Sequence, residues 1–591
     1  MNEFVDYLNS TNNAGGNSTG SLAETQVKSE YFDSVKVDRN LGRYIADTVR
    51  NLDYRAFILT GHAGDGKTSV LVQVLKELNL LSPGEGLDRI KEYSDFFYVK
   101  DMSEIAEEQQ TEILEQSLGA PANNKSSLLI SNTGPLLNTF LRLAKYAREL
   151  KGLEFKEEER IELQSKLLTQ LDTNTDEEIT VEGYSFYLVN IARVDNVSFS
   201  SEILKKIVSW ELWSKCNCCH SKDRCPIYNN IIWLNTQLGR VTRFVESYYR
   251  FLYENDKRMT IRQMVGQISY AITGNLTCTF INNHYLKEPL FNYNFANLFF
   301  GYIGLNEARH SSQIKGISQI KLLALDQKSL DVDYKLFVNN DFKSFFIEPV
   351  ASELVELRKK HQKHYQILTE EDAHSASEQG NEAKLRRAIR RFYLLYSADS
   401  KEEYLFNQIF GTNYSLYEKL VSNKQPKSVL RNVQTLLFRA LYIKNTGFLP
   451  DNTSELPLTL RRENSVFQNV MLVLGTLSKN DLIIIQKSVS SAFEDIDNKQ
   501  ALYLKVNDQL FPLTLPMLTY FDDLVQGSIS SNSNPALTHG IAKLDTLLLD
   551  EFGEEVPESE DDCELKLLIN TTSGQEIRYF AFDGNNLSIL S

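Results

Sequence analysis

Short apolar runs alternate with helix-like spacing along the first 200 residues of the chain. Residues 55–60 (RAFILT) form an apolar run that leads directly into a glycine-rich loop, which is the pattern of a buried strand. After this loop, Val70, Val74 and Leu78 recur at the spacing of one helix face. Further apolar runs that predict strands are DFFYV (95–99), LLIS (128–131) and FYLV (186–189). Strands that alternate with helices predict a parallel α/β sheet.

Near residue 200 the pattern becomes mainly helical. Thr260 and Gln263 form a capping-box pair, and they predict a helix that ends at Gly274. Later β-like runs, which mix with helical segments, are LIII (482–485), ALYLKV (501–506) and ELKLLI (564–569). The predicted divisions are a flexible tail (1–30), an α/β domain (31–200), a helical subdomain (201–284), a mainly helical domain (285–450) and a mixed α+β C-terminal domain (451–591).

The composition is that of an acidic globular protein. The chain has 591 residues, and 63 Lys and Arg against 78 Asp and Glu give a net charge of −15. Hydrophobic residues make up 42% and charged residues 24%, which excludes a wholly disordered or fibrous chain. Because no apolar run reaches the roughly 18 residues of a membrane span and no signal peptide is visible, we expect a cytoplasmic protein. The acidic balance argues against coating nucleic acid with the whole surface but permits a local basic groove.

The glycine-rich loop at residues 61–68 (GHAGDGKT) matches the pattern G-x-x-x-x-G-K-[ST] between a predicted strand and a predicted helix. Glycines let backbone N–H groups wrap phosphates, and the helix N-terminus adds positive potential. Lys67 is expected to reach the β- and γ-phosphates of ATP, and the Thr68 hydroxyl to ligate Mg²⁺. The predicted nucleotide-binding residues are Gly61, Gly64, Gly66, Lys67, Thr68 and Ser69. The predicted fold is an α/β P-loop NTPase domain of the AAA+/STAND-like kind; the alternative is a chance glycine turn.

A hydrolysing site of this kind also needs an acidic residue at the end of a neighbouring strand. Asp101 follows the run at 95–99, and we predict it as the residue on the metal side, with a strand-end turn as the alternative. Asn132 and Asn190 each follow a predicted strand and are the candidate polar sensors of the γ-phosphate. Together with Lys67 they complete the predicted catalytic set. Candidate arginines for contact with a γ-phosphate, from this chain or a neighbouring subunit, include Arg240, Arg243 and Arg262, and the alternative is that they are solvated surface residues.

Four cysteines lie within ten residues, in the segment CNCCHSKDRC (216–225). A C-x-x-C pair lets two thiolates face one tetrahedral ion, so we predict structural Zn²⁺ here. The predicted zinc ligands are Cys216, Cys219 and Cys225 with Cys278 as the fourth, and Cys218 and His220 are alternatives for that fourth position. Free thiols or a redox pair are the other interpretations. The segment has no open-site motif of a catalytic zinc enzyme.

Two basic runs stand out, at residues 357–364 and 384–391. If the second run is helical, Lys384, Arg387 and Arg391 line one face, and such a face can track the phosphates of double-stranded DNA. The predicted DNA-contacting residues are Arg386, Arg387, Arg390 and Arg391. The alternative is a solvated helix face that nearby acids balance.

Five segments, in this order, resemble the DptF family of DNA phosphorothioation-dependent restriction proteins: GHAGDGKTS, FYVKDMSE, LLISNTGPL, CNCCHSKDRCPIYNN and RMTIRQMVGQISYAITGNLTC. The resemblance covers roughly residues 30–280 by motif. It implies a cytoplasmic ATPase that works with partner proteins to restrict DNA lacking a sulfur modification of its backbone. Carried over to this chain, Gly61, Gly66, Lys67 and Thr68 would bind nucleotide. Cys216, Cys219, Cys225 and Cys278 would hold a metal.

The expected function is therefore that of the ATP-binding and ATP-hydrolysing component of a multi-protein bacterial restriction complex, active against phage DNA. The expected partners are other proteins of that complex, double-stranded DNA and further copies of this chain. Two alternatives are a nucleotide-gated scaffold with little hydrolysis and a signal-transducing P-loop ATPase of another phage-defence system. No cluster of metal-binding carboxylates predicts a nuclease in this chain.

Overall fold

The computed structural model divides the chain into two compact units. The first comprises residues 1–253, 257–405 and 490–497, and the second comprises 254–256, 406–489 and 498–591. The residues that the structure describes are 1–12, 29–62, 64–82, 85–173, 175–309, 311–360, 376–398, 402–460, 469–488, 493, 495, 499–528, 535–554, 563–571, 574–582 and 587–590. Among them, no helix combines the length and the hydrophobicity that crossing a membrane requires.

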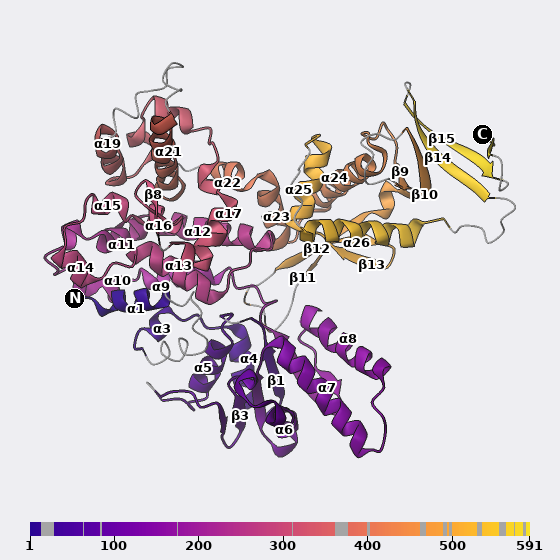
Figure 1. Ribbon diagram of the computed structural model, residues 1–591, viewed down its shortest axis with the longest axis horizontal. Helices are drawn as coiled ribbons and strands as arrows, with labels where there is room; N and C mark the ends of the chain where they lie inside the picture. Colours follow the sequence, from indigo (N-terminus) through magenta and orange to yellow (C-terminus); the bar gives the residue numbers. More distant parts are fainter. Residues whose placement is uncertain are drawn as a thin grey trace. The chain divides into compact units, whose positions relative to one another are not determined.

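The first unit contains a six-stranded sheet in the order β2-β3-β4-β1-β6-β5 (Figure 1). Its strands are β1 (Ala56–Thr60), β2 (Ile90–Glu92), β3 (Phe96–Val99), β4 (Ser126–Ile130), β5 (Ile179–Val181) and β6 (Tyr184–Asn190). The four inner strands run parallel, and the edge strands β2 and β5 are antiparallel to their neighbours. The predicted α/β sheet is therefore confirmed, and each predicted strand of the first 200 residues is one of the inner four.

Every residue of β1 is buried, because helices cover both faces of the sheet. Successive side chains of a strand point to opposite faces, so Phe57 and Leu59 pack on one side, and Ala56 and Ile58 on the other. The first face is covered by α4 (Asn40–Arg50) and α5 (Lys67–Glu77). The second face is covered by α6 (Glu107–Gly119), α7 (Thr133–Leu150) and α8 (Glu157–Thr173).

Helix α13 (Ile261–Thr273) is the centre of the helical layer of this unit. It begins with the predicted capping box of Thr260 and Gln263, and Gly274 ends it in the left-handed conformation, as predicted. Around it pack α1 (Glu3–Asn12), α9 (Phe199–Ile207), α11 (Pro226–Thr236), α16 (Phe295–Phe299) and α17 (Lys315–Leu323). Helix α12 (Leu238–Glu254) precedes α13 in the chain.

The predicted flexible tail is wrong for residues 3–12, which form helix α1. Phe4, Val5 and Leu8 lie on one helix face and are buried, so this segment has the apolar stripe that a docked helix needs. Helix α1 approaches α13 at Gly266, where an added Cβ would lie 3.1 Å from the Thr11 carbonyl oxygen. Residues 13–28 of the predicted tail lie outside the described residues.

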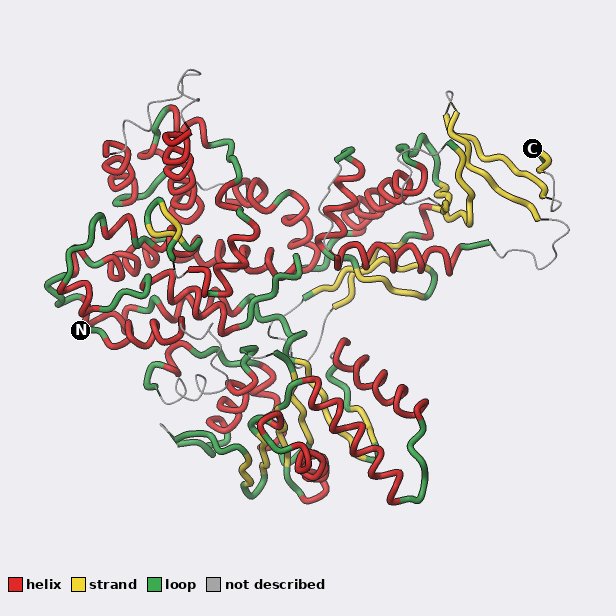
Figure 2. The backbone as a smooth tube through the Cα atoms, in the orientation of Figure 1, coloured by secondary structure: helices red, strands yellow, loops and turns green. Residues whose placement is uncertain are grey.

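The second unit combines helices with antiparallel sheets, whose strands are yellow in Figure 2. The strand orders are β16-β15-β14-β10-β9 and β11-β12-β13, and they include β10 (Val470–Ser478), β13 (Gln509–Pro512), β15 (Gly574–Phe582) and β16 (Leu587–Ile589). The strands predicted from apolar runs are present as β11 (Ile483–Ser488), β12 (Gln500–Val506) and β14 (Cys563–Thr571). Sequence analysis divides the chain at residue 450, whereas this unit already includes α24 (Lys427–Thr446). The reason is packing, since α24 contacts β9 (Glu455–Leu460) and α25 (Leu515–Val525).

Residues 490–497 belong to the first unit although their neighbours in the chain belong to the second. Phe493 is fully buried, and its ring packs edge-on against those of Tyr44 and Tyr187 at centroid distances of 5.9 and 6.2 Å. The Asp495 carboxylate accepts a hydrogen bond of 2.8 Å from the backbone N–H of Asn40, the first residue of α4. A distant segment therefore completes the core on the α4 side of the sheet.

Phe493→Ala is expected to destabilise the first unit by about 3–5 kcal/mol, because it opens a cavity in an aromatic cluster. All three tryptophans of the chain (Trp210, Trp213 and Trp233) lie in this unit, so tryptophan fluorescence during denaturant titration reports its unfolding. Phe280→Ala is the matched control, since Phe280 is 40% exposed in the same unit. Equal midpoints for the two variants would contradict the structural role of residue 493.

Candidate functional site

The backbone of the glycine-rich loop requires its glycines. Gly61, Gly64 and Gly66 have φ angles of +140°, +92° and +92°, values that other residues rarely adopt. An added Cβ at Gly61 would lie 2.7 Å from the Ile191 side chain, and one at Gly64 would lie 3.0 Å from the Thr260 hydroxyl. The loop therefore packs tightly against two segments, one that directly follows β6 and one that directly precedes α13.

Helix α5 begins at Lys67, directly after the loop, and Gly66 is its N-cap. The first N–H groups of a helix have no partner within the helix, and the helix dipole places positive potential at this end. Thr68 and Ser69, in the first turn, line a pocket of about 410 Å³ together with Gly64, Gly66 and Lys67. This end of the pocket has the chemistry of an anion site.

Lys67 is 8% exposed, and its ammonium group stays close to the loop backbone. Its Nζ donates to the carbonyl oxygens of Gly61 at 2.6 Å and His62 at 3.2 Å, and to Oδ1 of Asn132 at 3.3 Å. Burial lowers the pKa of Lys67, while the carboxylates of Asp65 and Asp101 act in the opposite direction. A buried lysine that contacts carbonyl groups at the edge of a pocket is placed to exchange them for phosphate oxygens.

The structure brings Asp101 and Asn132 to the same pocket as Lys67 and leaves Asn190 out of it. The reason is strand order, because β3 and β4 lie on one side of β1 and β6 lies on the other. The Asn190 side chain donates to the carbonyl oxygen of Leu171 and accepts from the N–H of Ala192, both at 3.1 Å. Of the two candidate sensors, Asn132 is therefore the one at the site.

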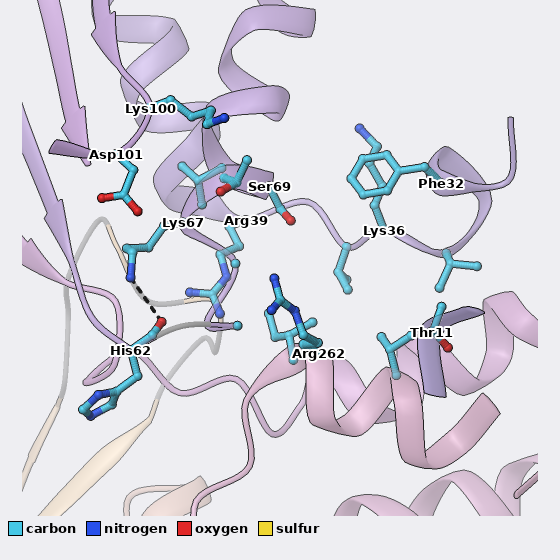
Figure 3. Close-up of a pocket in the computed structure, with 18 of the residues that line it drawn as sticks. Thr11, Phe32, Lys36, Arg39, His62, Lys67, Ser69, Lys100, Asp101 and Arg262 are labelled. Carbon is cyan, nitrogen blue, oxygen red and sulfur yellow. Dashed lines mark hydrogen bonds between the residues drawn. The ribbon is translucent and has the colours of Figure 1, made fainter. Parts of the chain in front are cut away.

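Asp101 lies just beyond β3, and its carboxylate faces the pocket near Lys67 (Figure 3). Its Oδ1 accepts a hydrogen bond of 2.9 Å from the N–H of Ser103, which fixes the orientation of the carboxylate. Lys100 and Glu104 line the pocket beside it, and sequence analysis did not select Lys100. The sequence did contain a signal for Lys100, because it directly precedes the acidic Asp101 at the end of a predicted strand.

Of the three arginines considered from sequence, Arg262 lines the pocket, whereas Arg240 and Arg243 belong to α12. Arg262 is in the first turn of α13, and its guanidinium points into the pocket between α5 and α13 (Figure 3). Burial lowers the pKa of Arg262, and the positive charge of Arg262 contributes to the lowered pKa of Lys67. Among the described residues it has no ion-pair partner. Two neighbouring cations therefore face the same polar end of the pocket.

Elsewhere the pocket lining is mixed, and apolar side chains predominate in it. It includes Tyr7 from α1, Phe32 and Val35 from α3 (Phe32–Val35), Val37, Val265 from α13, and the polar residues Thr11, Lys36 and Arg39. Ile261 lies beside Gly66 of the loop. Large ligand pockets in proteins combine such apolar walls with a few converging polar groups. The arrangement suits a ligand with a flat apolar part and a highly charged part.

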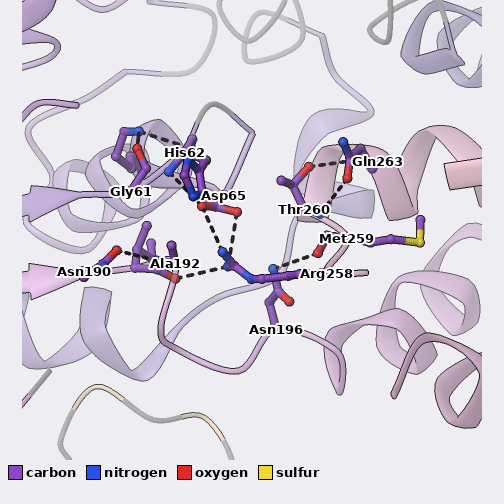
Figure 4. Close-up of polar contacts among 12 residues, drawn as sticks. Gly61, His62, Asp65, Asn190, Ala192, Asn196, Arg258, Met259, Thr260 and Gln263 are labelled. Carbon is purple, nitrogen blue, oxygen red and sulfur yellow. Dashed lines mark hydrogen bonds and ion pairs between the residues drawn. The ribbon is translucent and has the colours of Figure 1, made fainter. Parts of the chain in front are cut away.

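A buried ion pair, which sequence analysis missed, joins the loop to the segment before α13 (Figure 4). Asp65 is fully buried, and its two carboxylate oxygens lie 3.2 and 3.4 Å from the guanidinium nitrogens of Arg258. Asp65 also accepts a hydrogen bond of 3.0 Å from the N–H of His62, and Arg258 donates to the Ile191 carbonyl at 3.5 Å. The sequence offered one signal for this pair, because Asp65 is a charged residue at a position where the glycine-loop pattern allows any residue.

The four cysteines of the predicted zinc set are partly buried in the first unit, whereas Cys218 and His220 are exposed. Burial raises the pKa of Cys216 and raises that of Cys225 to about 11, and the Cys278 thiol contributes to both shifts. Cys216 also interacts with Cys219, and Asn2 of the N-terminal segment contacts both Cys216 and Cys278. Within the part of the chain that the structure describes, no group of three or more potential ligands is arranged to hold a metal. Zinc binding stays a prediction.

The predicted basic helix is present as α21 (Ala376–Tyr396), but two of its arginines have structural roles. Arg390 forms a forked ion pair with Asp333, with a closest distance of 2.5 Å, and Arg391 is buried beside Asp326. Arg386 and Arg387 are half-buried. In the other basic run, residues 361–364 lie outside the described residues. DNA contact through this helix stays a prediction, and it depends on Arg386 and Arg387.

Comparisons with protein families, with curated proteins and with solved structures find no match to this chain. The family resemblance of the five segments described above therefore stays a prediction.

Arg258→Gln is expected to cost on the order of 3 kcal/mol of first-unit stability, because it leaves the Asp65 carboxylate buried without its charge partner. Arg50→Gln serves as the control, since the Arg50–Asp47 pair is 46% and 61% exposed and such pairs contribute about 1 kcal/mol or less. Tryptophan fluorescence during denaturant titration measures both variants. If the two lose equal stability, the buried pair does not hold the loop.

Cysteine alkylation by iodoacetamide at pH 8 is expected to modify Cys218 first and Cys225 slowest. A pKa near 11 leaves Cys225 with roughly 100-fold less thiolate than an unperturbed thiol, and raising the pH toward 11 increases its reactivity. Peptide mass spectrometry measures each site, with and without a zinc chelator. Faster labelling of Cys216, Cys219, Cys225 and Cys278 after chelation, together with zinc in elemental analysis, supports the zinc prediction; labelling that chelation leaves unchanged contradicts it.

Proposed function

We propose that the first unit binds ATP with Mg²⁺ at the glycine-rich loop and hydrolyses it, as a P-loop NTPase domain of the AAA+/STAND-like kind. The observation that carries this proposal is the convergence of Lys67, Arg262 and the start of α5 on one polar end of a pocket in whose remaining lining apolar side chains predominate. A triphosphate neutralises the two neighbouring cations, and the apolar side chains suit a purine ring.

The residues present fit a magnesium ion. The Thr68 hydroxyl and the Asp101 carboxylate line the same pocket, and Mg²⁺ is usually held by one or two protein oxygen ligands together with phosphate oxygens. When bound, the ion offsets negative charge on the phosphates. Asn132 would orient the attacking water or the γ-phosphate through its amide, which already contacts Lys67. Lys67 and Arg262 would stabilise the charge that spreads over the transferred phosphoryl group.

A nucleotide-gated scaffold is the second candidate, and the Asp65–Arg258 pair favours it. The loop contacts Arg258, before the start of α13, through Asp65, and it contacts the backbone N–H of Arg262, in the first turn of α13, through the carbonyl of Gly64. The Arg262 side chain also lines the pocket. Nucleotide binding would therefore alter contacts between the sheet and the helical layer even when turnover is slow.

The biological role that we propose rests on the family resemblance of residues 30–280. The chain would be the ATP-dependent component of a cytoplasmic, multi-protein restriction complex that acts on DNA lacking phosphorothioate modification. Structural zinc at the four partly buried cysteines would tie the segment at 216–225 to Cys278, at the start of α14 (Cys278–Asn283). The mutual electrostatic interactions of these thiols support that set over Cys218 and His220.

Lys67→Ala is expected to weaken ATP binding about 10–100-fold, because it removes a charge-assisted contact to phosphate. Asn132→Ala is expected to lower turnover, whereas Asn190→Ala leaves it near the wild-type value. The measurements are calorimetric ATP binding and steady-state phosphate release, with and without double-stranded DNA. The control is Lys76→Ala on the same helix, because Lys76 pairs with Asp33 and neither residue lines the pocket.

Unchanged ATP affinity in Lys67→Ala would exclude the glycine-rich loop as the nucleotide site. Tight binding with negligible turnover in the wild-type chain would instead identify the scaffold, and DNA-stimulated turnover would favour the restriction ATPase.

A further inference from the structure

A second cavity in the first unit, of about 270 Å³, lies where helix α21 meets the short hairpin of β7 (Tyr302–Ile303) and β8 (Asn306–Glu307). Its lining residues are Tyr302, Leu305, Asn306, Glu307, Lys384, Arg387 and Arg391. None of them lines the glycine-loop pocket. The basic run of α21, which the proposed function leaves largely unexplained, therefore forms part of a cavity wall.

Arg391 is the rigid part of this wall, because it is 1% exposed and held on every side. Its Nε donates to Oδ1 of Asn297 at 3.0 Å, its Nη2 donates to the Gly304 carbonyl at 3.2 Å, and its Nη1 lies 3.4 Å from Asp326. The guanidinium also lies 4.0 Å from the ring centre of Tyr302. A guanidinium has five N–H donors, so these three hydrogen bonds leave donors available.

Arg387 lies one helix turn before Arg391 on the same face of α21 and lines the same cavity. Among the described residues it has no ion pair, although it interacts electrostatically with Arg391 and Asp326. Lys384, one turn earlier, donates to Oδ1 of Asn306 at 3.2 Å across the cavity rim. Three cations therefore follow one face of the helix into the cavity.

The carboxylates near this cavity already have cationic partners. Asp326 faces Arg391, and Glu307 at the rim is 67% exposed and pairs with Lys321 at 3.1 Å. Lys384 and Arg387 are then the uncompensated charges of the wall, in a protein whose net charge is −15. A local positive excess in an acidic protein, inside a cavity with a fixed arginine, favours a compact anion.

We propose that this cavity is a binding site for a phosphate monoester, with Arg387 and Lys384 contacting the phosphate and Arg391 supporting them. A flat surface that follows a DNA backbone fits less well, because Arg390 is turned toward Asp333 and Arg391 is buried. A cavity of this size takes one phosphate group with a small attached part rather than a length of duplex. The ligand would be free phosphate, a small phosphorylated molecule or the terminal phosphate of a nucleic acid strand.

Calorimetric titration of the full chain with inorganic phosphate tests the site, in the wild type and in a Lys67→Ala background that weakens the glycine-loop pocket. Saturable binding is expected in both proteins. Arg387→Gln is expected to weaken phosphate binding about 10-fold or more, because the substitution removes a guanidinium that can donate two hydrogen bonds to one phosphate. Arg386→Gln is the matched control, since it removes the same charge from the neighbouring position outside the cavity lining. Arg387→Lys keeps the charge and is expected to retain part of the affinity.

A second arm identifies the source of the phosphate. A 3′-fluorescent DNA dodecamer with a 5′-phosphate is compared with the same strand ending in a 5′-hydroxyl, by fluorescence anisotropy. Preference for the phosphorylated strand that Arg387→Gln abolishes supports a strand-end ligand, and binding of inorganic phosphate alone supports a small ligand. Absence of saturable binding of every probe up to about 10 mM, or equal losses in Arg387→Gln and Arg386→Gln, overturns the proposal.

Discussion

The buried Asp65–Arg258 pair is the contact on which the organisation of the candidate site depends. A fully buried carboxylate is costly to keep charged unless a cation and hydrogen bonds compensate it, so the loop conformation and the position of Arg258 stabilise each other. Because Arg258 precedes the cap of α13 by two residues, the same contact sets where that helix begins. The helix start in turn places Arg262 opposite Lys67. One ion pair therefore connects the sheet, the loop and the helical layer.

Sequence patterns predicted the parts of the molecule that local chemistry determines. The inner strands, the glycine-rich loop between a strand and a helix, and the Thr260–Gln263 capping box each depend on neighbouring residues, and all are present. Asp101 and Asn132, which sequence analysis selects for catalytic roles, both line the pocket, because residues at the carboxyl ends of parallel strands share one edge of the sheet. Their catalytic roles stay predictions. Choosing between Asn132 and Asn190 required the strand order, which a single sequence does not reveal.

Features that depend on long-range contacts were missed. Helix α1 was taken for a flexible tail, since its ten residues are too few to be helical without a partner. Arg390 and Arg391 were predicted to contact DNA because a basic helix face can track phosphates, but Asp333 and Asp326 face them from elsewhere in the first unit. In each case the missing information was the identity of the packing partner, not the propensity of the segment itself.

The place of Phe493 in the sheet domain has a consequence for synthesis on the ribosome. Phe57 of β1 and Phe493 share one hydrophobic core but are separated by 493 − 57 = 436 residues. At about 5–20 residues per second, roughly 20–90 s pass between the appearance of the central strand and of the side chain that closes its core. During that interval Phe493 does not yet cover the rings of Tyr44 and Tyr187, so the nascent chain exposes aromatic surface that the finished protein partly buries.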